Sequence, residues 1–311
     1  MKKIHIVTDS MAHIPDSLCQ ELEIKVVPLP FVWDGETHFD FDIGPREFYT
    51  KLRSGKTLPS TSGPPPVLFK EQFETLGVDG KPILTITVGE VFSSTFNAAN
   101  LAKEMVANIR VVVVSSDSNT MGHGFQVLAA ARAAQAGKDL NEILSILEHV
   151  KYTSGVVFAT PHIEYLRRGG RISHIQYYFA TSLKLIPVME IRNSPIKPVK
   201  RIRRQKNVIP SLLNLVSERL ENERPIRMAV VHADAESQAW ELAKEVRQRF
   251  SPDELITSEI TPVLGIHGGP DSVVDVNVYI GLQLFEDAGD YASFRRDIIS
   301  AIPRIIHTSI I

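Results

Sequence analysis

Hydroxyl side chains gather at the points where several predicted strands end. Asp9-Ser10 follows the first strand, Ser93-Ser94-Thr95 comes after the third, and Ser115-Ser116-Asp117-Ser118 follows the fourth. In an open α/β sheet, ligands bind beyond the carboxyl ends of the strands. Ser93-Ser94-Thr95 also opens a predicted helix, whose free N–H groups and dipole favour a small anion. The pattern indicates an anion-binding site, with plain capping of the helix by Ser93 as the competing interpretation.

Two further segments carry polar groups that could join such a site. Residues 59–64 read Pro-Ser-Thr-Ser-Gly-Pro, and this composition alone predicts a turn. His267 is preceded by Gly265-Ile266 and followed by Gly268-Gly269, at the end of a strand predicted over 255–266. Glycine lets a backbone come close to a ligand, but a histidine beside glycines is also common in simple turns. Both interpretations of His267 stay open on these residues alone.

The sequence lacks complete motifs for nucleotide or metal chemistry. It has no phosphate-binding loop, no dinucleotide-binding glycine motif and no His-Glu-x-x-His. A single cysteine, Cys19, permits neither an intramolecular disulfide nor a thiolate metal cluster. Asp40 and Asp42 lie in a polar segment, where we expect both carboxylates to face solvent. We therefore predict no resident metal and no cofactor.

A basic stretch lies late in the chain, over residues 197–206, and Arg171 adds a further cation upstream. One interpretation is a sheet edge protected by charge, and the other is docking of an anionic or nucleotide-bearing partner. The net charge of −2 and the lack of interleaved aromatic side chains argue against nucleic acid. The six cations of the stretch are Lys197, Lys200, Arg201, Arg203, Arg204 and Lys206.

Two kinds of architecture follow one another along the chain. The first part alternates β-branched runs with helical patterns, which predicts an α/β domain with a parallel sheet over residues 1–155. Its expected strands are 4–7, 24–29, 83–88 and 109–114, and its expected helices are 93–107, 124–136 and 139–152. The last helix is expected to begin with a capping box of Asp139 and Glu142.

The second part predicts an α+β domain with a mixed sheet over residues 156–290, because hairpin signals occur among its helices. Its expected strands are 156–160, 183–192, 196–202, 228–232, 255–266 and 273–284, and its expected helices are 210–220 and 236–250. We expect residues 291–311 to form a helical C-terminal extension.

The length of 311 residues and a hydrophobic fraction of 43% suit a folded protein of two domains. The first residues lack the apolar stretch of a signal peptide, and no run approaches the roughly 18 apolar residues of a membrane span. These features predict a cytoplasmic protein.

Six segments, taken in order, resemble the DegV family of bacterial fatty-acid-binding proteins. The most specific is Tyr165-Leu166-Arg167-Arg168-Gly169-Gly170-Arg171-Ile172-Ser173, which resembles the family's Leu-x-Lys-Gly-Gly-Arg-Ile signature. The other five are Ile6–Ser10, Pro59–Pro64, Ser93–Phe96, Asp117-Ser118 with Gly122 and Gly124, and Ile266–Pro270.

The resemblance implies a long-chain fatty acid held between the two domains. Its carboxylate would bind to Thr61, Ser93 and His267, with the backbone N–H of Ser94 close by. The resemblance also implies an ATP-dependent fatty-acid kinase as partner, which phosphorylates the bound carboxylate to an acyl phosphate. The chain itself would then have no catalytic residues, and lipid exchange would involve transient contact with a membrane.

The resemblance further implies that cations dock the kinase. Arg171 is the expected docking residue, and Arg201 and Arg203 are expected to help.

This sequence departs from the usual family pattern at several positions. Ser94 replaces a glycine, Gly63 replaces a glutamine, and Ile186 replaces a lysine.

Two other functions remain open at this point. One is an acyl or phosphoryl hydrolase with Ser93 as nucleophile and His267 as base, oriented by Asp9 or Asp117. The other is a lipid-responsive regulator that binds nucleic acid or protein through the basic stretch over residues 197–206.

Overall fold

The computed structural model describes residues 3–55, 57–160, 162–172, 185–192, 195–220, 225–270 and 275–280, the last range as backbone. The expected helical extension over 291–311 lies outside these ranges. So do part of the hairpin turn and the first residues of the strand predicted over 183–192.

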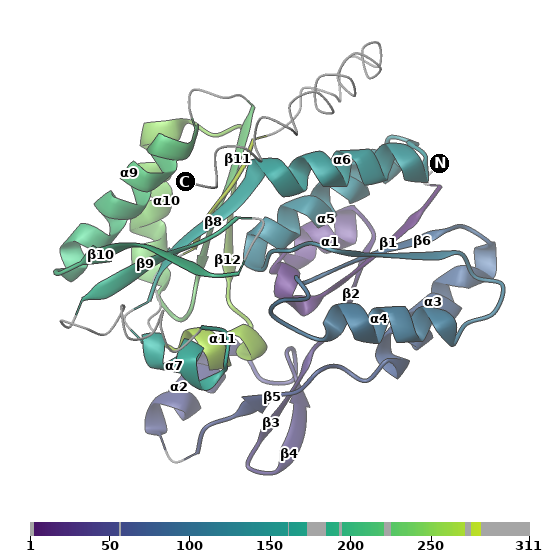
Figure 1. The fold of residues 1–311 in the computed structure, drawn as a ribbon, viewed down its shortest axis with the longest axis horizontal. Helices are drawn as coiled ribbons and strands as arrows, with labels where there is room; N and C mark the ends of the chain where they lie inside the picture. Colours follow the sequence, from purple (N-terminus) through teal and green to yellow (C-terminus); the bar gives the residue numbers. More distant parts are fainter. Residues whose placement is uncertain are drawn as a thin grey trace, which may run out of the picture. The chain divides into compact units, whose positions relative to one another are not determined.

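A parallel sheet forms the N-terminal part of the fold, as predicted. It contains β1 (His5–Asp9), β2 (Ile24–Val27), β6 (Ile83–Thr87) and β7 (Val111–Ser115), in the order β2-β1-β6-β7. Figure 1 labels the first three strands of this order. All three neighbouring pairs are parallel. Ile6 and Val7, successive residues of β1 that point to opposite faces, enter different apolar clusters, so that both faces of the sheet are covered.

A mixed six-stranded sheet forms the later part, again as predicted. Its order is β10-β9-β8-β13-β11-β12, and only the pair β11 and β12 is parallel. The strands are β8 (Ser154–Ala159), β9 (Ile186–Ile191), β10 (Lys197–Ile202), β11 (Ile226–His232), β12 (Glu254–Glu259) and β13 (Asp275–Ile280). Its apolar cluster includes residues of α9 (Val208–Leu220) and α10 (Glu236–Phe250).

The helix α5 (Thr120–Gln135) contacts strands of both large sheets, namely β1 and β6 of the first and β8, β11 and β13 of the second. All of its residues except Arg132 and Gln135 are buried. A helix that is buried on every side belongs in a core, and one apolar cluster includes side chains from both sheets. α5 also packs against α6 (Leu140–Thr153), whose predicted capping box of Asp139 and Glu142 is present.

A small antiparallel sheet, absent from our sequence predictions, lies between β2 and β6 in the chain. It has the order β4-β3-β5 and consists of β3 (Pro30–Trp33), β4 (Glu36–Phe39) and β5 (Ser60–Thr61). Asp34-Gly35 joins the first two strands with positive φ at both residues, which favours a tight hairpin turn. The turn predicted over 59–64 was therefore wrong at Ser60–Thr61, which pair with β3.

The strand predicted over 255–266 was wrong in its second half. β12 ends at Glu259, and α11 (Pro262–Gly268) follows, with Pro262 at its start and Gly269 as its C-cap. The other helices among the described residues are α1 (Asp16–Glu21), α2 (Pro45–Ser54), α3 (Val67–Leu76), α4 (Thr95–Glu104) and α7 (Ile163–Arg168). Short 3-10 turns are η1 (Ser10–Ala12), η2 (Gly77–Asp79) and η3 (Gln205–Asn207).

Candidate functional site

One pocket is lined by all four residues that we expected to bind a carboxylate. Thr61 comes from β5, Ser93 and Ser94 precede α4, and His267 comes from α11. Arg171 lines the same pocket. Its apolar lining comprises Met11, Leu29, Phe92, Leu166, Ile196, Val263 and Leu264. The pocket thus joins a polar group of hydroxyls, a histidine and a cation to an apolar surface.

His267 and Thr61 form a direct hydrogen bond, with 2.9 Å between Nε2 and Oγ1. Burial, followed by the charge of Arg171, lowers the pKa of His267 to about 4, so that the ring is neutral at pH 7. Its Nδ1 is buried and has no partner among the described residues, so we assign the ring proton to Nε2, which donates to Thr61 Oγ1. The Thr61 hydroxyl proton then remains available to donate to an acceptor in the pocket.

Gly169 and Gly170 have different structural roles in bringing α7 to this site. α7 ends in a Schellman motif, in which Gly170 N–H donates to Arg167 O at 3.0 Å and Arg171 N–H donates to Leu166 O at 3.1 Å. The motif needs a positive φ, which is 72° at Gly170. Gly169 instead provides space, because a Cβ there would lie 2.0 Å from His267 Nδ1. The glycine pair therefore turns the chain and lets the histidine ring pack against it.

Arg171 lies in the pocket lining, next to the serine-containing loop. Its Nε donates to the Phe92 carbonyl at 3.0 Å, and Nη1 donates to the carbonyl of Gly169. Burial lowers the pKa of this guanidinium, and no carboxylate pairs with it among the described residues. A half-buried cation whose described partners are carbonyl groups can attract an anionic group, either on a ligand or on a docking partner.

Arg201 and Arg203 lie elsewhere in the fold. Arg201 is an exposed residue of β10, the edge strand of the six-stranded sheet, and the exposed Arg203 follows it. Neither is among the described residues that line the pocket.

The two serines before α4 are held by local contacts. Ser93 Oγ lies 2.7 Å from Thr95 Oγ1 and accepts the Thr95 N–H at 3.3 Å, so that Ser93 supports the helix start as well as lining the pocket. Ser94 Oγ packs against Gly63, where a Cβ would lie only 2.0 Å from that oxygen. The departures from the family pattern at positions 63 and 94 are therefore in contact with each other.

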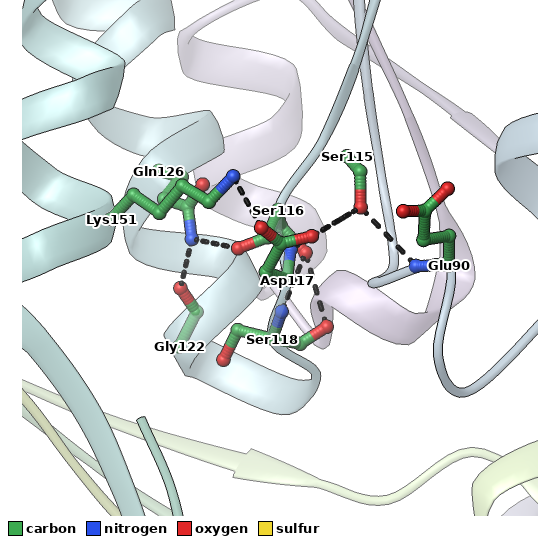
Figure 2. A network of polar contacts seen from close by, with 8 residues as sticks. All are labelled: Glu90, Ser115, Ser116, Asp117, Ser118, Gly122, Gln126 and Lys151. Carbon is green, nitrogen blue, oxygen red and sulfur yellow. Dashed lines mark hydrogen bonds and ion pairs between the residues drawn. The ribbon is translucent and has the colours of Figure 1, made fainter. Parts of the chain in front are cut away.

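The third group of hydroxyls, Ser115–Ser118, is structural. Figure 2 shows Ser115 Oγ donating to Asp117 Oδ1 at 2.8 Å, while Ser116 Oγ donates to Ser118 O at 3.0 Å. Asp117 also pairs with Lys151 of α6, and Gln126 of α5 donates to the Ser116 carbonyl at 2.9 Å. These hydrogen bonds stabilise the connection between β7 and α5, so the hydroxyls of Ser115 and Ser116 have a structural role there.

The predicted solvent exposure of Asp40 was wrong, although Asp42 is exposed. Asp40 is 2% exposed, and its Oδ2 accepts from Ser10 Oγ at 2.5 Å. Its Oδ1 accepts from Val263 N–H at 2.7 Å. Burial raises the pKa of this carboxyl to about 7. The residues around Asp40 in the sequence did not indicate that it is buried, because its hydrogen-bond partners are distant in sequence.

The structure does not assemble the serine hydrolase that the sequence left open. Ser93 is bonded to Thr95, and His267 is bonded to Thr61. Asp9 accepts the backbone N–H groups of Met11 and Val88 with its two oxygens, and Asp117 pairs with Lys151. A nucleophile, base and orienting acid in one hydrogen-bonded series is therefore not present among these candidates.

The described residues contain neither a metal-binding cluster nor a membrane-spanning helix. They contain no group of three or more His, Cys, Asp or Glu side chains arranged to hold a metal ion. No helix among them has the length and apolar character needed to span a membrane.

Comparison with known proteins identifies the family. Residues 3–274 match the DegV family model, whose members are described as uncharacterised proteins. A DegV domain-containing protein from Caldanaerobacter subterraneus is 33% identical over 274 residues, which is 88% of this chain and 97% of the relative. One from Clostridium perfringens is 30% identical over 275 residues, covering 87% of this chain and 96% of the relative.

Solved structures agree with this assignment. The chain resembles a DegV family protein from Thermus thermophilus, described for its fatty acid binding, with a TM-score of 0.83 and 29% identity. It also resembles DegV of Bacillus subtilis, described as a fatty acid binding protein, with a TM-score of 0.82 and 29% identity. Each match covers 90% of this chain and 100% of the solved chain. The chain therefore belongs to the DegV family.

Proposed function

We propose that this protein binds a long-chain fatty acid and has no catalytic activity of its own. The observation that carries the proposal is the single pocket in which Thr61, Ser93, Ser94 and His267 meet Arg171 beside an apolar lining. The fatty acid binding described for the Thermus thermophilus and Bacillus subtilis proteins supports the same ligand class. The acyl chain would lie between the N-terminal domain, 1–155, and the C-terminal domain, 156–290.

Neutral donors suit the carboxylate head of such a ligand. The Thr61 hydroxyl is free to donate, because the assigned His267 Nε2 proton already occupies one acceptor position of Thr61. Ser93 and the backbone N–H of Ser94 add donors at the start of α4, where the helix dipole favours negative charge. The acyl chain supplies most of the affinity, at about 0.8 kcal/mol for each buried CH₂ group before the costs of association.

Mass spectrometry of organic extracts tests the ligand. We expect near-stoichiometric fatty acid in wild-type protein purified without added lipid, and depletion in Ser93→Ala. Ser145→Ala is the matched control, because Ser145 is an exposed residue of α6 whose hydroxyl donates to the Asn141 carbonyl of the same helix. A wild-type protein that stays empty after incubation with mixed fatty acids would contradict the proposal.

We further propose that the bound carboxylate is presented to an ATP-dependent fatty-acid kinase, which converts it to an acyl phosphate. The absence of a phosphate-binding loop in this sequence supports a nucleotide site on the partner. The cation Arg171 beside the pocket and the exposed cations Arg201 and Arg203 support docking of a nucleotide-bearing partner. Loading and release of the lipid would involve transient contact with a membrane.

Acyl phosphate formation, trapped as a hydroxamate in a reaction with a fatty-acid kinase and ATP, tests this step. We expect slower turnover for Arg171→Ala and for the double variant Arg201→Ala/Arg203→Ala, with the lipid still bound. Arg249→Ala, on α10, controls for the loss of a cation elsewhere. If Arg171→Ala lost its lipid, Arg171 would be a ligand-binding residue, and its assignment to docking would be wrong.

A further inference from the structure

The first turn of α11, the helix that carries His267, is buried. α11 begins with Pro262 after the N-cap Thr261, whose side chain makes no capping hydrogen bond. The first N–H groups of any helix lack partners within the helix and need acceptors from elsewhere. In α11 these groups lie in the core, because Pro262 and Val263 are buried. The position of the helix therefore depends on which groups accept these hydrogen bonds.

Two buried side chains from distant parts of the chain accept them. Asp40 Oδ1 accepts the Val263 N–H at 2.7 Å, across 223 residues of sequence. His13 Nε2 accepts the Thr261 N–H at 3.2 Å, and His13 Nδ1 lies 2.8 Å from the Met11 carbonyl, to which it donates. Asp40 is 2% exposed and His13 is 4% exposed, and both side chains also line a separate cavity beside Thr261 and Pro262.

Thr61, the hydrogen-bond partner of His267, is connected to Asp40 through the small antiparallel sheet. Thr61 belongs to β5, which pairs with β3 of the small sheet. Asp40 directly follows β4 of that sheet, and its N–H donates to the Leu29 carbonyl at 3.1 Å, just before β3. A shift of α11 relative to this sheet would therefore change the distance between the His267 ring and the Thr61 hydroxyl.

We propose that Asp40 and His13 are positioning residues for the carboxylate site, which hold the first turn of α11 so that His267 meets Thr61. This inference rests on the proposed function, because it assigns these residues a role in recognising the carboxylate. Neither side chain lines that pocket among the described residues, so their effect passes through α11. The role differs from general stabilisation because it concerns the head group of the ligand and not the acyl chain.

A comparison of hexadecanoic acid with hexadecan-1-ol tests the proposal. The two ligands share the acyl chain, and the alcohol lacks the carboxylate. The readout is the ratio of their dissociation constants for each variant. We expect Asp40→Ala to weaken binding of the acid roughly tenfold, the size of one lost hydrogen bond to a charged group, with a much smaller effect on the alcohol. A merely destabilising substitution would weaken both ligands alike.

Conservative and remote variants sharpen the test. Asp40→Asn keeps an acceptor for the Val263 N–H and is expected to retain most of the preference for the acid. Asp139→Ala removes a helix cap from α6, which has no residue in the pocket lining, and is expected to leave the preference unchanged. His13→Leu removes the acceptor of the Thr261 N–H and should lower the preference for the acid over the alcohol. If Asp40→Ala does not fold, the ratio of dissociation constants of His13→Leu tests the positioning role instead.

The possible failures are distinguishable. If the wild type binds the acid but Asp40→Ala and His13→Leu keep its preference over the alcohol, the positioning role is wrong and the proposed function stands. If the wild type binds neither ligand, the proposed function fails, and the positioning role fails with it.

Discussion

Gly63 and Ser94 share a space that holds only one side chain in the present arrangement. A Cβ at Gly63 would lie 2.0 Å from Ser94 Oγ but 3.4 Å from Ser94 Cβ. The conflict therefore concerns the hydroxyl alone, which can leave only by rotating about χ1. The size of the residue at position 63 thus determines where the Ser94 hydroxyl lies within the pocket lining.

A double-mutant cycle at these two positions is the first prediction. Gly63→Ala should displace the Ser94 hydroxyl, lowering the free energy of unfolding by about 1 kcal/mol and weakening fatty-acid binding. In the Ser94→Gly background the same alanine meets no hydroxyl, so we expect its cost to fall to near zero. Chemical denaturation of the four proteins measures the coupling. Additive effects of the two substitutions would show that the residues do not interact.

At the residue scale, the sequence predicted the residues that line the pocket better than it predicted Asp40, which bonds to the first turn of α11. Thr61, Ser93 and His267 were identified through short motifs that resemble the DegV family, and the structure brings them to one pocket. Asp40 was missed because its partners, Ser10 and Val263, are 30 and 223 residues away. A buried carboxylate between polar neighbours has no local pattern that distinguishes it from an exposed one.

At the scale of elements, local signals explain both the successes and the main error. The capping box at Asp139 located the start of α6, and β-branched runs located the parallel strands. The strand predicted over 255–266 overlooked Pro262 and Gly269, which mark a helix start and a helix end. The small sheet was missed because its strands are only two to four residues long, although Asp34-Gly35 is a hairpin signal.

The close packing of α5 gives the second prediction. A Cβ at Gly124 would lie 2.5 Å from the Ala12 carbonyl oxygen of η1, a backbone atom that cannot rotate away. We expect Gly124→Ala to lower the free energy of unfolding by about 1–3 kcal/mol, in spite of the better helix propensity of alanine.

Gly155→Ala is the matched control for this substitution. The nearest atom to a Cβ at Gly155, the Ile191 carbonyl oxygen, lies 3.9 Å away, which is ordinary contact. Urea denaturation compares the two variants with the wild type. Equal stability of Gly124→Ala and the wild type would show that η1 can move away from α5 at little cost.

At the scale of the whole chain, the site depends on contacts that no local pattern contains. Thr61 and His267 are 206 residues apart, and Arg171 and Phe92 are 79 apart. The apolar periodicity of each element does not specify how the two large sheets share the helix α5. The arrangement around the pocket could be expected only from the resemblance to a family, whereas the individual strands and helices could be predicted from their own residues.

Buried aspartates and buried histidines change the stability of the chain in opposite directions as pH rises. Burial raises the pKa of Asp9 and of Asp40 to about 7, above their usual value of 3.8. From about pH 4 to 7 these folded-state carboxyls bind more protons than the unfolded chain, so their contribution to stability falls as pH rises. Burial lowers the pKa of His13, His123 and His267 to about 4, so their contribution rises from about pH 4 to 6.5.

The last prediction separates these two contributions. Asp40→Asn removes a carboxyl whose contribution to stability falls as pH rises. The free energy of unfolding of this variant, relative to that of the wild type, should therefore increase between pH 4.5 and 7.5. His123→Gln removes a buried imidazole whose contribution to stability rises with pH. The free energy of unfolding of this variant, relative to that of the wild type, should therefore decrease between pH 4.5 and 6.5. Urea denaturation at closely spaced pH values measures both differences. The opposite signs matter because a general loss of packing would shift each curve without changing its slope, and parallel curves would contradict the assigned protonation states.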